Sequence, residues 1–396
     1  MASFSVRFLG CKISYADAQE IRERLLADGH EERSGTADAA VVNTCCVTHE
    51  AIRKSRHAAA RAARSHERVY VTGCGANLAG DAFAGLPENI VVVARRGEET
   101  PDHVARDFGA LACAQAEHRR DRVRAFVKIQ DGCSFSCSFC VIPLVRGASR
   151  SRAAAAVLGE IEKRIRQGHR EVILSGINLG CYRDRPAGFG LARLIRETGA
   201  IPGLARLRLS SIEVNHLTDE VVAALHETPT VARHLHVPLQ SGDDGVLEAM
   251  RRRYTARTYL HRVAAVADFN LTTDVIVGFP TEDELAFRRT LAVVEEAGIT
   301  KVHVFPYSPR PGTATAADDP VPAPVKKERS ARLRAQSHAA CLRRWRKKIG
   351  CEDVVLVDRP GRGYGDDYSP WLVEGPVGEL VRVRGRAVTE EGILAA

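Results

Sequence analysis

Residues 131–140 read Asp-Gly-Cys-Ser-Phe-Ser-Cys-Ser-Phe-Cys and place Cys133, Cys137 and Cys140 on one short loop. The loop follows residues 123–129, an apolar run that predicts a buried strand. Three thiolates can hold three irons of a [4Fe–4S] cluster and leave the fourth iron open to a substrate or cofactor. A structural zinc site requires four ligands, and no other cysteine or histidine lies nearby in the sequence. A zinc loop completed by a distant residue, or plain buried thiols, is the alternative interpretation.

A second set of cysteines lies in the first hundred residues. Apolar runs at 6–10, 39–43, 69–73 and 90–93 predict strands, and residues 16–27 and 50–65 predict helices between them. Cys11, Cys45 and Cys74 each follow one of these strands. Because parallel strands end at the same edge of a sheet, the three thiols are expected to converge there. The alternative is that small residues beside Gly10 and Gly73 simply suit strand ends.

The chain of 396 residues is long enough for two or three domains. We predict an α/β architecture with an N-terminal doubly wound parallel domain (1–108), a central partial barrel of six strand–helix units (122–325), a basic linker helix (326–350) and a small C-terminal β-barrel (351–396). The barrel strands are expected at 123–129, 171–174, 206–210, 234–238, 273–277 and 301–305. A polar stretch at 109–121 predicts a linker.

Composition and charge narrow the functional class. The sequence has no long apolar run and no N-terminal basic-then-apolar pattern, so we expect a cytoplasmic protein with no membrane segment. Eleven cysteines in a reducing compartment indicate metal ligation, catalysis or packing rather than disulfides. The formal net charge of +8 suggests a polyanionic partner such as RNA.

Several blocks together resemble the radical S-adenosylmethionine (SAM) methylthiotransferase family over nearly the whole chain. The Cys-x3-Cys-x2-Cys loop with Phe139 before its last cysteine is similar to the signature of the radical SAM superfamily. The blocks that match the methylthiotransferases are residues 9–12, 43–45, 72–74 and 128–133, then 143, 146–147 and 150–151, and finally 210–213, 238–242 and 274–280. The C-terminal segment resembles a TRAM domain, a small RNA-binding barrel.

The resemblance implies two [4Fe–4S] clusters and SAM as cofactors. Cys11, Cys45 and Cys74 would hold an auxiliary cluster, and Cys133, Cys137 and Cys140 the cluster that cleaves SAM to a 5′-deoxyadenosyl radical. Two residues depart from the family pattern: Ser14 stands where asparagine is usual, and Cys46 doubles Cys45 and could compete with it.

Residues 10–12 and 127–133 are most similar to the branch that acts on tRNA. That branch adds a methylthio group to carbon 2 of N6-threonylcarbamoyladenosine beside the anticodon. The implied partners are tRNA, an electron donor protein and a sulfur donor. Two alternatives stay open: a sister enzyme acting on isopentenyladenosine or on a ribosomal-protein aspartate, and a non-catalytic metal-dependent RNA-binding protein.

Further site residues follow by resemblance or by charge. The predicted cofactor contacts are Phe139, Ser175, Gly176, Asn178, Glu213, Gln240 and Ile276. The predicted substrate or RNA contacts are Arg146, Arg150, Lys326, Lys327, Arg343, Arg344, Arg346, Lys347 and Lys348. Glu213 and Gln240 could instead be ordinary solvated loop residues. Arg146 and Arg150 could instead form surface salt bridges, and the basic helix could simply present a solvated face.

Overall fold

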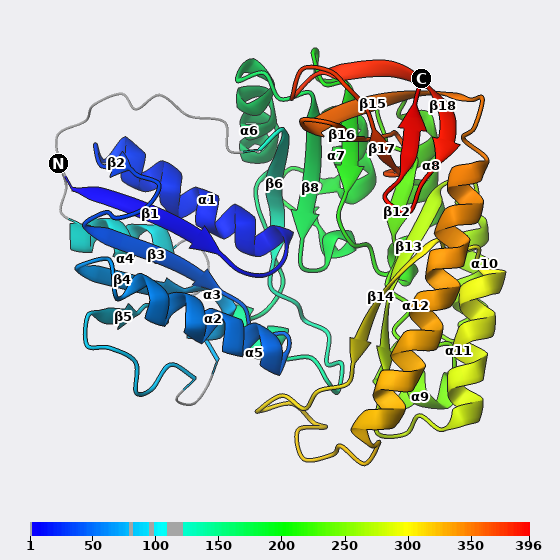
Figure 1. Cartoon of the computed structure of the whole chain (residues 1–396), viewed down its shortest axis with the longest axis horizontal. Helices are drawn as coiled ribbons and strands as arrows, with labels where there is room; N and C mark the ends of the chain where they lie inside the picture. Colours follow the sequence, from blue (N-terminus) through cyan, green and yellow to red (C-terminus); the bar gives the residue numbers. More distant parts are fainter. Residues whose placement is uncertain (1, 79–81, 95–98, 109–121) are drawn as a thin grey trace. The chain divides into compact units, whose positions relative to one another are not determined.

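The computed structural model describes all residues except 1, 79–81, 95–98 and 109–121 (Figure 1). The chain forms two compact units. Unit 1 comprises Met1–Arg119, Asp131–Arg150 and Ser308–Ala316, and unit 2 comprises Arg120–Gln130, Ser151–Tyr307 and Ala317–Ala396. The four-part division predicted above is finer and stays a prediction, and the predicted linker at 109–121 lies outside the described residues.

Unit 1 is built on a parallel five-stranded sheet with the order β2-β1-β3-β4-β5. Its strands are β1 (Ser3–Phe8), β2 (Glu31–Glu32), β3 (Ala39–Thr44), β4 (Arg68–Thr72) and β5 (Ile90–Val92). The helices are α1 (Lys12–Ala27), α2 (His49–Ala62), α3 (Gly73–Ala76), α4 (Glu99–Phe108) and α5 (Ile142–Arg146).

Alternation along the central strands explains why both faces of this sheet are covered. Val41 and Tyr70 pack with α1 and α4 in one core cluster, whereas Val42 and Val71 pack with α2 in another. Successive side chains of a strand point to opposite faces, so an uninterrupted apolar run such as Val41-Val42 must be buried on both sides. The predicted doubly wound parallel arrangement is therefore present.

Unit 2 contains the six strands expected of a partial barrel. They are β6 (Arg124–Asp131, whose last residue belongs to unit 1), β8 (Glu171–Gly176), β11 (Arg206–Leu209), β12 (His234–His236), β13 (Asn270–Val277) and β14 (Lys301–Pro306). They form two sheets with the orders β11-β8-β6-β7 and β12-β13-β14, where β7 is Arg150–Ser151. Bridges Leu207↔Val231 and Ser211↔His236 join the sheets into one curved layer.

Helices cover one face of this layer. They include α6 (Ala154–Arg166), α7 (Leu191–Gly199), α8 (Asp219–Glu227), α10 (Ala256–Ala264) and α11 (Glu284–Glu296). The short α9 (Asp244–Ala249), the hairpin of β9 (Arg183–Asp184) with β10 (Phe189–Gly190), and the 3-10 turns η1 (Leu179–Cys181) and η2 (Val214–His216) complete the connections. Leucine, isoleucine and valine side chains from the strands and helices form the largest core of the protein.

The long basic helix α12 (Ala323–Arg346) leads to a small closed barrel with the order β15-β16-β17-β19-β18. These strands are β15 (Glu352–Arg359), β16 (Arg362–Tyr364), β17 (Pro370–Leu372), β18 (Leu380–Val388) and β19 (Ile393–Ala395). None of the described helices has the length and apolarity needed to cross a membrane.

Buried charges attach this small barrel to the amino ends of the central strands. Glu171, at the start of β8, accepts hydrogen bonds from Arg206 at 3.2 Å and Arg208 at 2.8 Å. Arg208 in turn donates to the carbonyl oxygens of Gly365 (2.7 Å) and Asp366 (2.9 Å) in the small barrel. The opposite, carboxyl ends of the strands carry the predicted SAM residues.

Candidate metal centres

The N-terminal cysteines lie where the sequence predicted, at the carboxyl ends of neighbouring strands. Cys11 caps α1 directly after β1, and Cys74 lies in the first turn of α3 directly after β4. Cys45 follows β3, the strand between them. The pKa of the Cys45 thiol is raised to about 11, chiefly by burial and further by the negative charges of Cys74 and Cys11. Because β1, β3 and β4 are neighbouring parallel strands, the three cysteines lie at the same edge of the sheet.

Two glycines make this approach possible. Gly73 has a φ of +84°, and a Cβ there would overlap the Asn43 side chain and the Thr44 backbone. Gly10 has a φ of +124°, and a Cβ there would lie 2.8 Å from Ser14 Oγ and 3.3 Å from Cys45 Sγ. Glycine adopts this left-handed region at little cost. Ser14, the departure from the family pattern, is buried, and its hydroxyl contacts Cys11 Sγ at 3.9 Å.

Cys46 also faces this cluster. It is completely buried and packs with Cys74, Val141 and Val145. A hydrogen bond with the Cys46 thiol, helped by the positive charge of Arg146, lowers the pKa of Cys74 to about 7, while that bond and burial raise the pKa of Cys46. Cys74 therefore favours the thiolate, which is the form that ligates iron, and Cys46 stays protonated beside it.

The second cysteine set lies on the loop before α5, also in unit 1. Cys133, Cys137 and Cys140 are all partly exposed. The Cys133 amide donates to the Gly147 carbonyl oxygen at 3.0 Å, and the Cys140 amide donates to that of Cys137 at 3.1 Å. These bonds curl the loop into a compact turn, which suits a loop that supplies three ligands to a single cluster.

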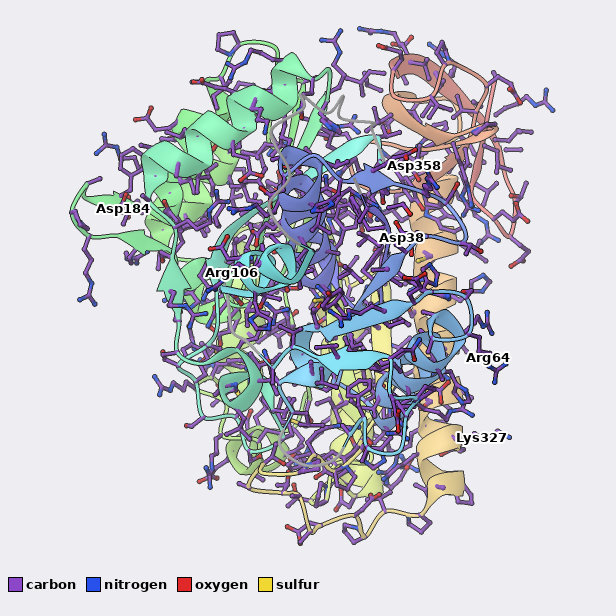
Figure 2. All side chains as sticks on the ribbon, turned by 90° about the vertical axis from the view of Figure 1, so that its left-hand side faces the viewer. Asp38, Arg64, Arg106, Asp184, Lys327 and Asp358 are labelled. Carbon is purple, nitrogen blue, oxygen red and sulfur yellow. The ribbon has the colours of Figure 1, made fainter. Side chains whose placement is uncertain are left out.

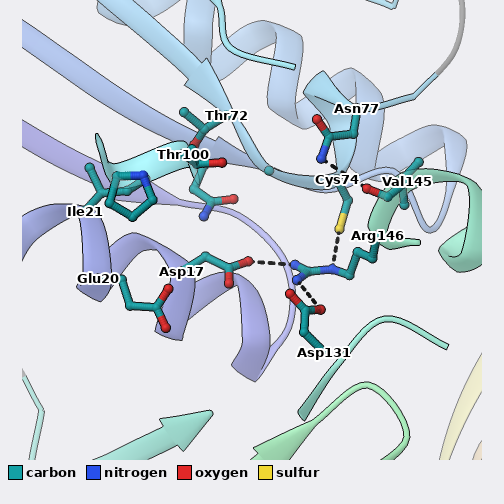
Figure 3. A pocket seen from close by; sticks show the side chains of 13 residues that line it. Asp17, Glu20, Ile21, Thr72, Cys74, Asn77, Thr100, Asp131, Val145 and Arg146 are labelled. Atoms are coloured by element: carbon teal, nitrogen blue, oxygen red, sulfur yellow. Dashed lines mark hydrogen bonds and ion pairs between the residues drawn. The ribbon is translucent and has the colours of Figure 1, made fainter. Parts of the chain in front are cut away.

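Arg146 is the main electrostatic element of unit 1. Its side chain is 6% exposed and forms ion pairs with Asp17 at 2.7 Å and Asp131 at 3.0 Å. Its Nε donates to Cys74 Sγ at 3.0 Å, so the guanidinium joins α1, α3 and the cysteine loop (Figure 3). A cavity of about 30 Å³ beside it is lined by these groups together with Glu20, Asn43 and Asn77. The sequence predicted Arg146 as a substrate or RNA contact, but the structure directs it inward to two carboxylates and a sulfur.

The residues predicted to hold SAM in unit 2 include a buried acceptor that suits its amino group. Ser175 and Gly176 end β8, and Asn178 follows, all little exposed. The backbone N–H of Asn178 donates a hydrogen bond to Gln130 Oε1 at 2.9 Å. Its side-chain Oδ1 is buried and has no hydrogen-bond partner among the described residues. An unpaired buried acceptor is costly, so a ligand that donates to it would be favoured.

Three further predicted SAM residues lie at or after the ends of neighbouring strands: Glu213 after β11, Gln240 after β12 and Ile276 near the end of β13. Gln240 has a φ of +66° and is fixed between backbone bonds to Asp274 (2.8 Å) and Ile276 (2.9 Å). Glu213 caps η2 and pairs with Arg252 at 3.4 Å, and burial raises its pKa. Glu213 therefore already has protein partners. Phe139, in unit 1, is half-buried.

The predicted RNA contacts divide into inward and outward groups. Lys326 is buried and bonds Asp319 and the Tyr307 carbonyl oxygen, Arg344 pairs with Asp367 at 2.9 Å, and Lys348 pairs with Asp353 at 2.9 Å. All three thus have partners within unit 2, although the side chains of Arg344 and Lys348 remain 26% and 22% exposed. Arg150 is half-exposed and lies 4.0 Å from Asp131. The outward group on and after α12 is Lys327, Arg343, Arg346 and Lys347 (Lys327 is visible in Figure 2).

The sequence did not reveal the two carboxylates that pair with Arg146 beside Cys74. Asp17 falls within the helix predicted at residues 16–27, and Asp131 falls within the block at 128–133 that matches the family. The signal available for Asp131 was its position two residues before Cys133. Nothing in the sequence pattern indicated that Asp17 meets Arg146, because 129 positions separate them.

Comparisons with known proteins agree with this architecture. Residues 127–294 match the model of the radical SAM superfamily, and residues 3–94 match one described as uncharacterized protein family UPF0004. The radical SAM methyltransferase TsrM from Kitasatospora setae has a similar fold, with a TM-score of 0.60 and 15% identity over 79% of this chain and 76% of that one. The fold and its cysteine loop define a radical SAM enzyme, a class whose cofactors are SAM and a [4Fe–4S] cluster.

Sequence relatives narrow the family. The threonylcarbamoyladenosine tRNA methylthiotransferase MtaB of Thermotoga maritima is 32% identical over 100% of this chain and 97% of its own length. That of Bacillus subtilis is 36% identical over 97% and 94%. The tRNA-2-methylthio-N(6)-dimethylallyladenosine synthase of Streptomyces viridosporus is 34% identical over 93% and 78%. The chain belongs to the radical SAM methylthiotransferase family.

Proposed function

We propose that this enzyme adds a methylthio group to carbon 2 of N6-threonylcarbamoyladenosine in tRNA, beside the anticodon. The observation that carries the proposal is the full-length similarity to the two MtaB relatives, combined with two separate three-cysteine sets in unit 1. A tRNA substrate would place the activity in the cytoplasm. An electron donor protein and a sulfur donor would complete the reaction.

The cysteines would divide the work. Cys133, Cys137 and Cys140 would hold the cluster that binds SAM, and Cys11, Cys45 and Cys74 would hold the auxiliary cluster. Together with SAM, these groups supply radical chemistry, which an aromatic C–H bond requires because it is too weakly acidic for side-chain bases. The protein contributes position and electrostatics: Arg146 favours the thiolate of Cys74, and Asn178 Oδ1 offers an acceptor to the SAM amino group.

Unit 2 offers a surface suited to the RNA. Arg382, Arg384 and Arg386 alternate with buried residues along β18 and face outward, and the first two also form exposed ion pairs with Glu352. The end of α12 lies beside them, since the Gly350 amide donates to the Gly385 carbonyl oxygen at 2.7 Å. Arg346 and Lys347 are exposed there. We call these five cations the basic face. Clustered lysines and arginines bind phosphates without reading sequence, as a TRAM-like domain would.

The sister reaction on dimethylallyladenosine is the second candidate. The Streptomyces viridosporus relative matches at 34% identity, between the two MtaB values of 32% and 36%. Identity alone does not separate the two substrates. Coverage does not separate them either, because the dimethylallyladenosine synthase of Cereibacter sphaeroides matches over 94% of its own length, as the Bacillus subtilis MtaB does.

Nucleoside analysis separates the candidates. The gene would be deleted in its host, and tRNA digests would be examined by mass spectrometry. Loss of the methylthio form of threonylcarbamoyladenosine, restored by the wild type but not by a Cys133→Ala/Cys137→Ala/Cys140→Ala variant, is expected. Loss of the methylthio form of the dimethylallyl nucleoside would instead assign the sister reaction.

A further inference from the structure

Two histidines and a carboxylate meet on neighbouring strands of unit 2. His236 lies on β12, Asp274 on β13 and His303 on β14. Asp274 and His303 are direct partners across β13 and β14, and His236 is paired with Thr272, two positions before Asp274. One ligand atom from each of the three side chains lies within 4.8 Å of the others.

Strand alternation shows which face of the sheet they share. Leu235, Val237, Val275, Val302 and Val304 pack into the core beneath the helices. His236, Asp274 and His303 alternate with these residues, so they lie on the opposite, concave face of the sheet. Asp274 is 27% exposed and His236 is 10% exposed by side chain. The group is therefore held on rigid strands and is open to small solutes.

The spacing already suits a metal ion. Two donors about 2.0–2.2 Å from a tetrahedral Zn²⁺ lie about 3.4 Å apart. His236 Nε2 and Asp274 Oδ2 are 3.3 Å apart. His303 is exposed and can close the remaining distance by a small side-chain movement.

The residues that contact these proposed ligands also suit a metal site. His236 Nδ1 is 3.0 Å from Thr272 Oγ1, which can accept its proton and leave Nε2 as the ligating atom. Metal-bound histidines commonly have such a partner on the other ring nitrogen. Among the described residues, the Asp274 carboxylate has a single ion-pair partner, His236, so its remaining lone pairs are available for a cation.

We propose that His236, Asp274 and His303 form a site for a divalent transition metal that uses no cysteine. Two imidazoles and one carboxylate on one face suit Zn²⁺, Fe²⁺ or Mn²⁺ and leave coordination positions for water or an oxygen donor of a bound molecule. The site does not depend on the proposed tRNA substrate, since it requires only the strands of unit 2.

Zinc is the probe for the test. Iron-loaded holoenzyme, washed with a chelator, would be given Zn²⁺, desalted and analysed for both metals by mass spectrometry. One zinc per chain is expected, with X-ray absorption showing nitrogen or oxygen neighbours at about 2.0–2.1 Å and no sulfur at about 2.3 Å. Full iron loading keeps the cysteines occupied, so zinc on sulfur would reveal a different site.

Variants connect the zinc to these side chains. Asp274→Asn keeps the shape and His303→Ala changes an exposed residue, and each is expected to weaken zinc binding at least tenfold with unchanged iron content. Thr272→Val should weaken it about 10–100-fold. His338→Ala removes another exposed histidine and should leave zinc binding intact. Absence of zinc from the wild type, sulfur neighbours, or full zinc retention in the first two variants would overturn the proposal.

Discussion

Arg146 balances two carboxylates and a thiolate in a buried place, so its removal should affect unit 1 more than that of any exposed arginine. Arg146→Ala leaves Asp17 and Asp131 without their main cation. Breaking a buried ion pair in this way costs about 3–5 kcal/mol. Faster hydrogen exchange in peptides from α1 and α3 would report the loss, and iron content should fall with it.

Arg150 is the matched control. Its side chain is 49% exposed, and its contact with Asp131 is 4.0 Å long. Arg150→Ala should change stability by less than about 1 kcal/mol, because solvent screens exposed pairs. Equal effects of the two substitutions would show that the buried network of Arg146 does not stabilise unit 1.

Gly73 permits a second residue-scale prediction. Gly73→Ala places a Cβ against Asn43 and Thr44 at a φ of +84°, whereas Gly85→Ala places one in open space at a φ of +70°. Both substitutions cost about 1 kcal/mol for the backbone conformation. Only Gly73→Ala adds overlap, so thermal unfolding of the metal-free proteins should rank it well below Gly85→Ala. Equal melting temperatures would contradict the close approach of β3 and α3.

At the scale of elements, the end of α12 carries exposed cations that remain for RNA. Arg343, Arg346 and Lys347 are exposed, and no described residue forms an ion pair with them. Changing all three to glutamine should reduce the slope of log affinity against log salt by about 2, at about 0.7 per phosphate contact. Filter binding of the tRNA anticodon stem-loop at several salt concentrations measures this slope.

An equally large change of charge elsewhere in unit 2 provides the comparison. Arg166, Arg193 and Arg257 are exposed on α6, α7 and α10. Their triple glutamine variant removes the same three charges and should leave the slope unchanged. A similar loss of slope in both variants would mean that the RNA responds to net charge and not to the end of α12.

The strands and cysteines could be predicted because each produces a local pattern. Apolar runs predicted all six barrel strands. The positions of Cys11, Cys45 and Cys74 after parallel strands predicted that they lie at one edge of the sheet. The two-residue β2, Glu31–Glu32, has no apolar run and could not be found in this way. The ion pairs of Lys326 and Arg344 depend on Asp319 and Asp367, acids whose positions only the folded chain determines.

At the scale of the whole molecule, Glu171 connects the central strands to the small barrel. Burial alone would raise the pKa of Glu171, but Arg208 and Arg206 outweigh it and hold the pKa below its ordinary value. A carboxyl with a lowered folded-state pKa stabilises the protein above its unfolded-state pKa. That contribution is lost as the pH falls through the folded-state value.

Glu171→Gln should therefore destabilise unit 2 by about 3–5 kcal/mol at pH 7, since it removes the buried carboxylate charge that Arg206 and Arg208 share. The difference from the wild type should shrink as the pH falls through the lowered folded-state pKa of Glu171, where the wild-type carboxyl also loses its charge. Both tryptophans, Trp345 and Trp371, lie in α12 and the small barrel, so urea unfolding followed by fluorescence reports this region. A constant difference at all pH values would contradict this role of the carboxylate charge.

Unit 1 is assembled from three separate stretches of chain, and the last of them, Ser308–Ala316, comes late. Thr315 donates to the Ser138 carbonyl oxygen on the cysteine loop through both its amide (3.2 Å) and its hydroxyl (3.1 Å). A ribosome adds about 5–20 residues each second, so roughly 9–35 s would separate the synthesis of the cysteine loop from that of Thr315. During translation the cysteine loop would therefore lack its hydrogen bonds from Thr315. Iron and sulfide delivered before residue 316 emerges would meet an incomplete binding site.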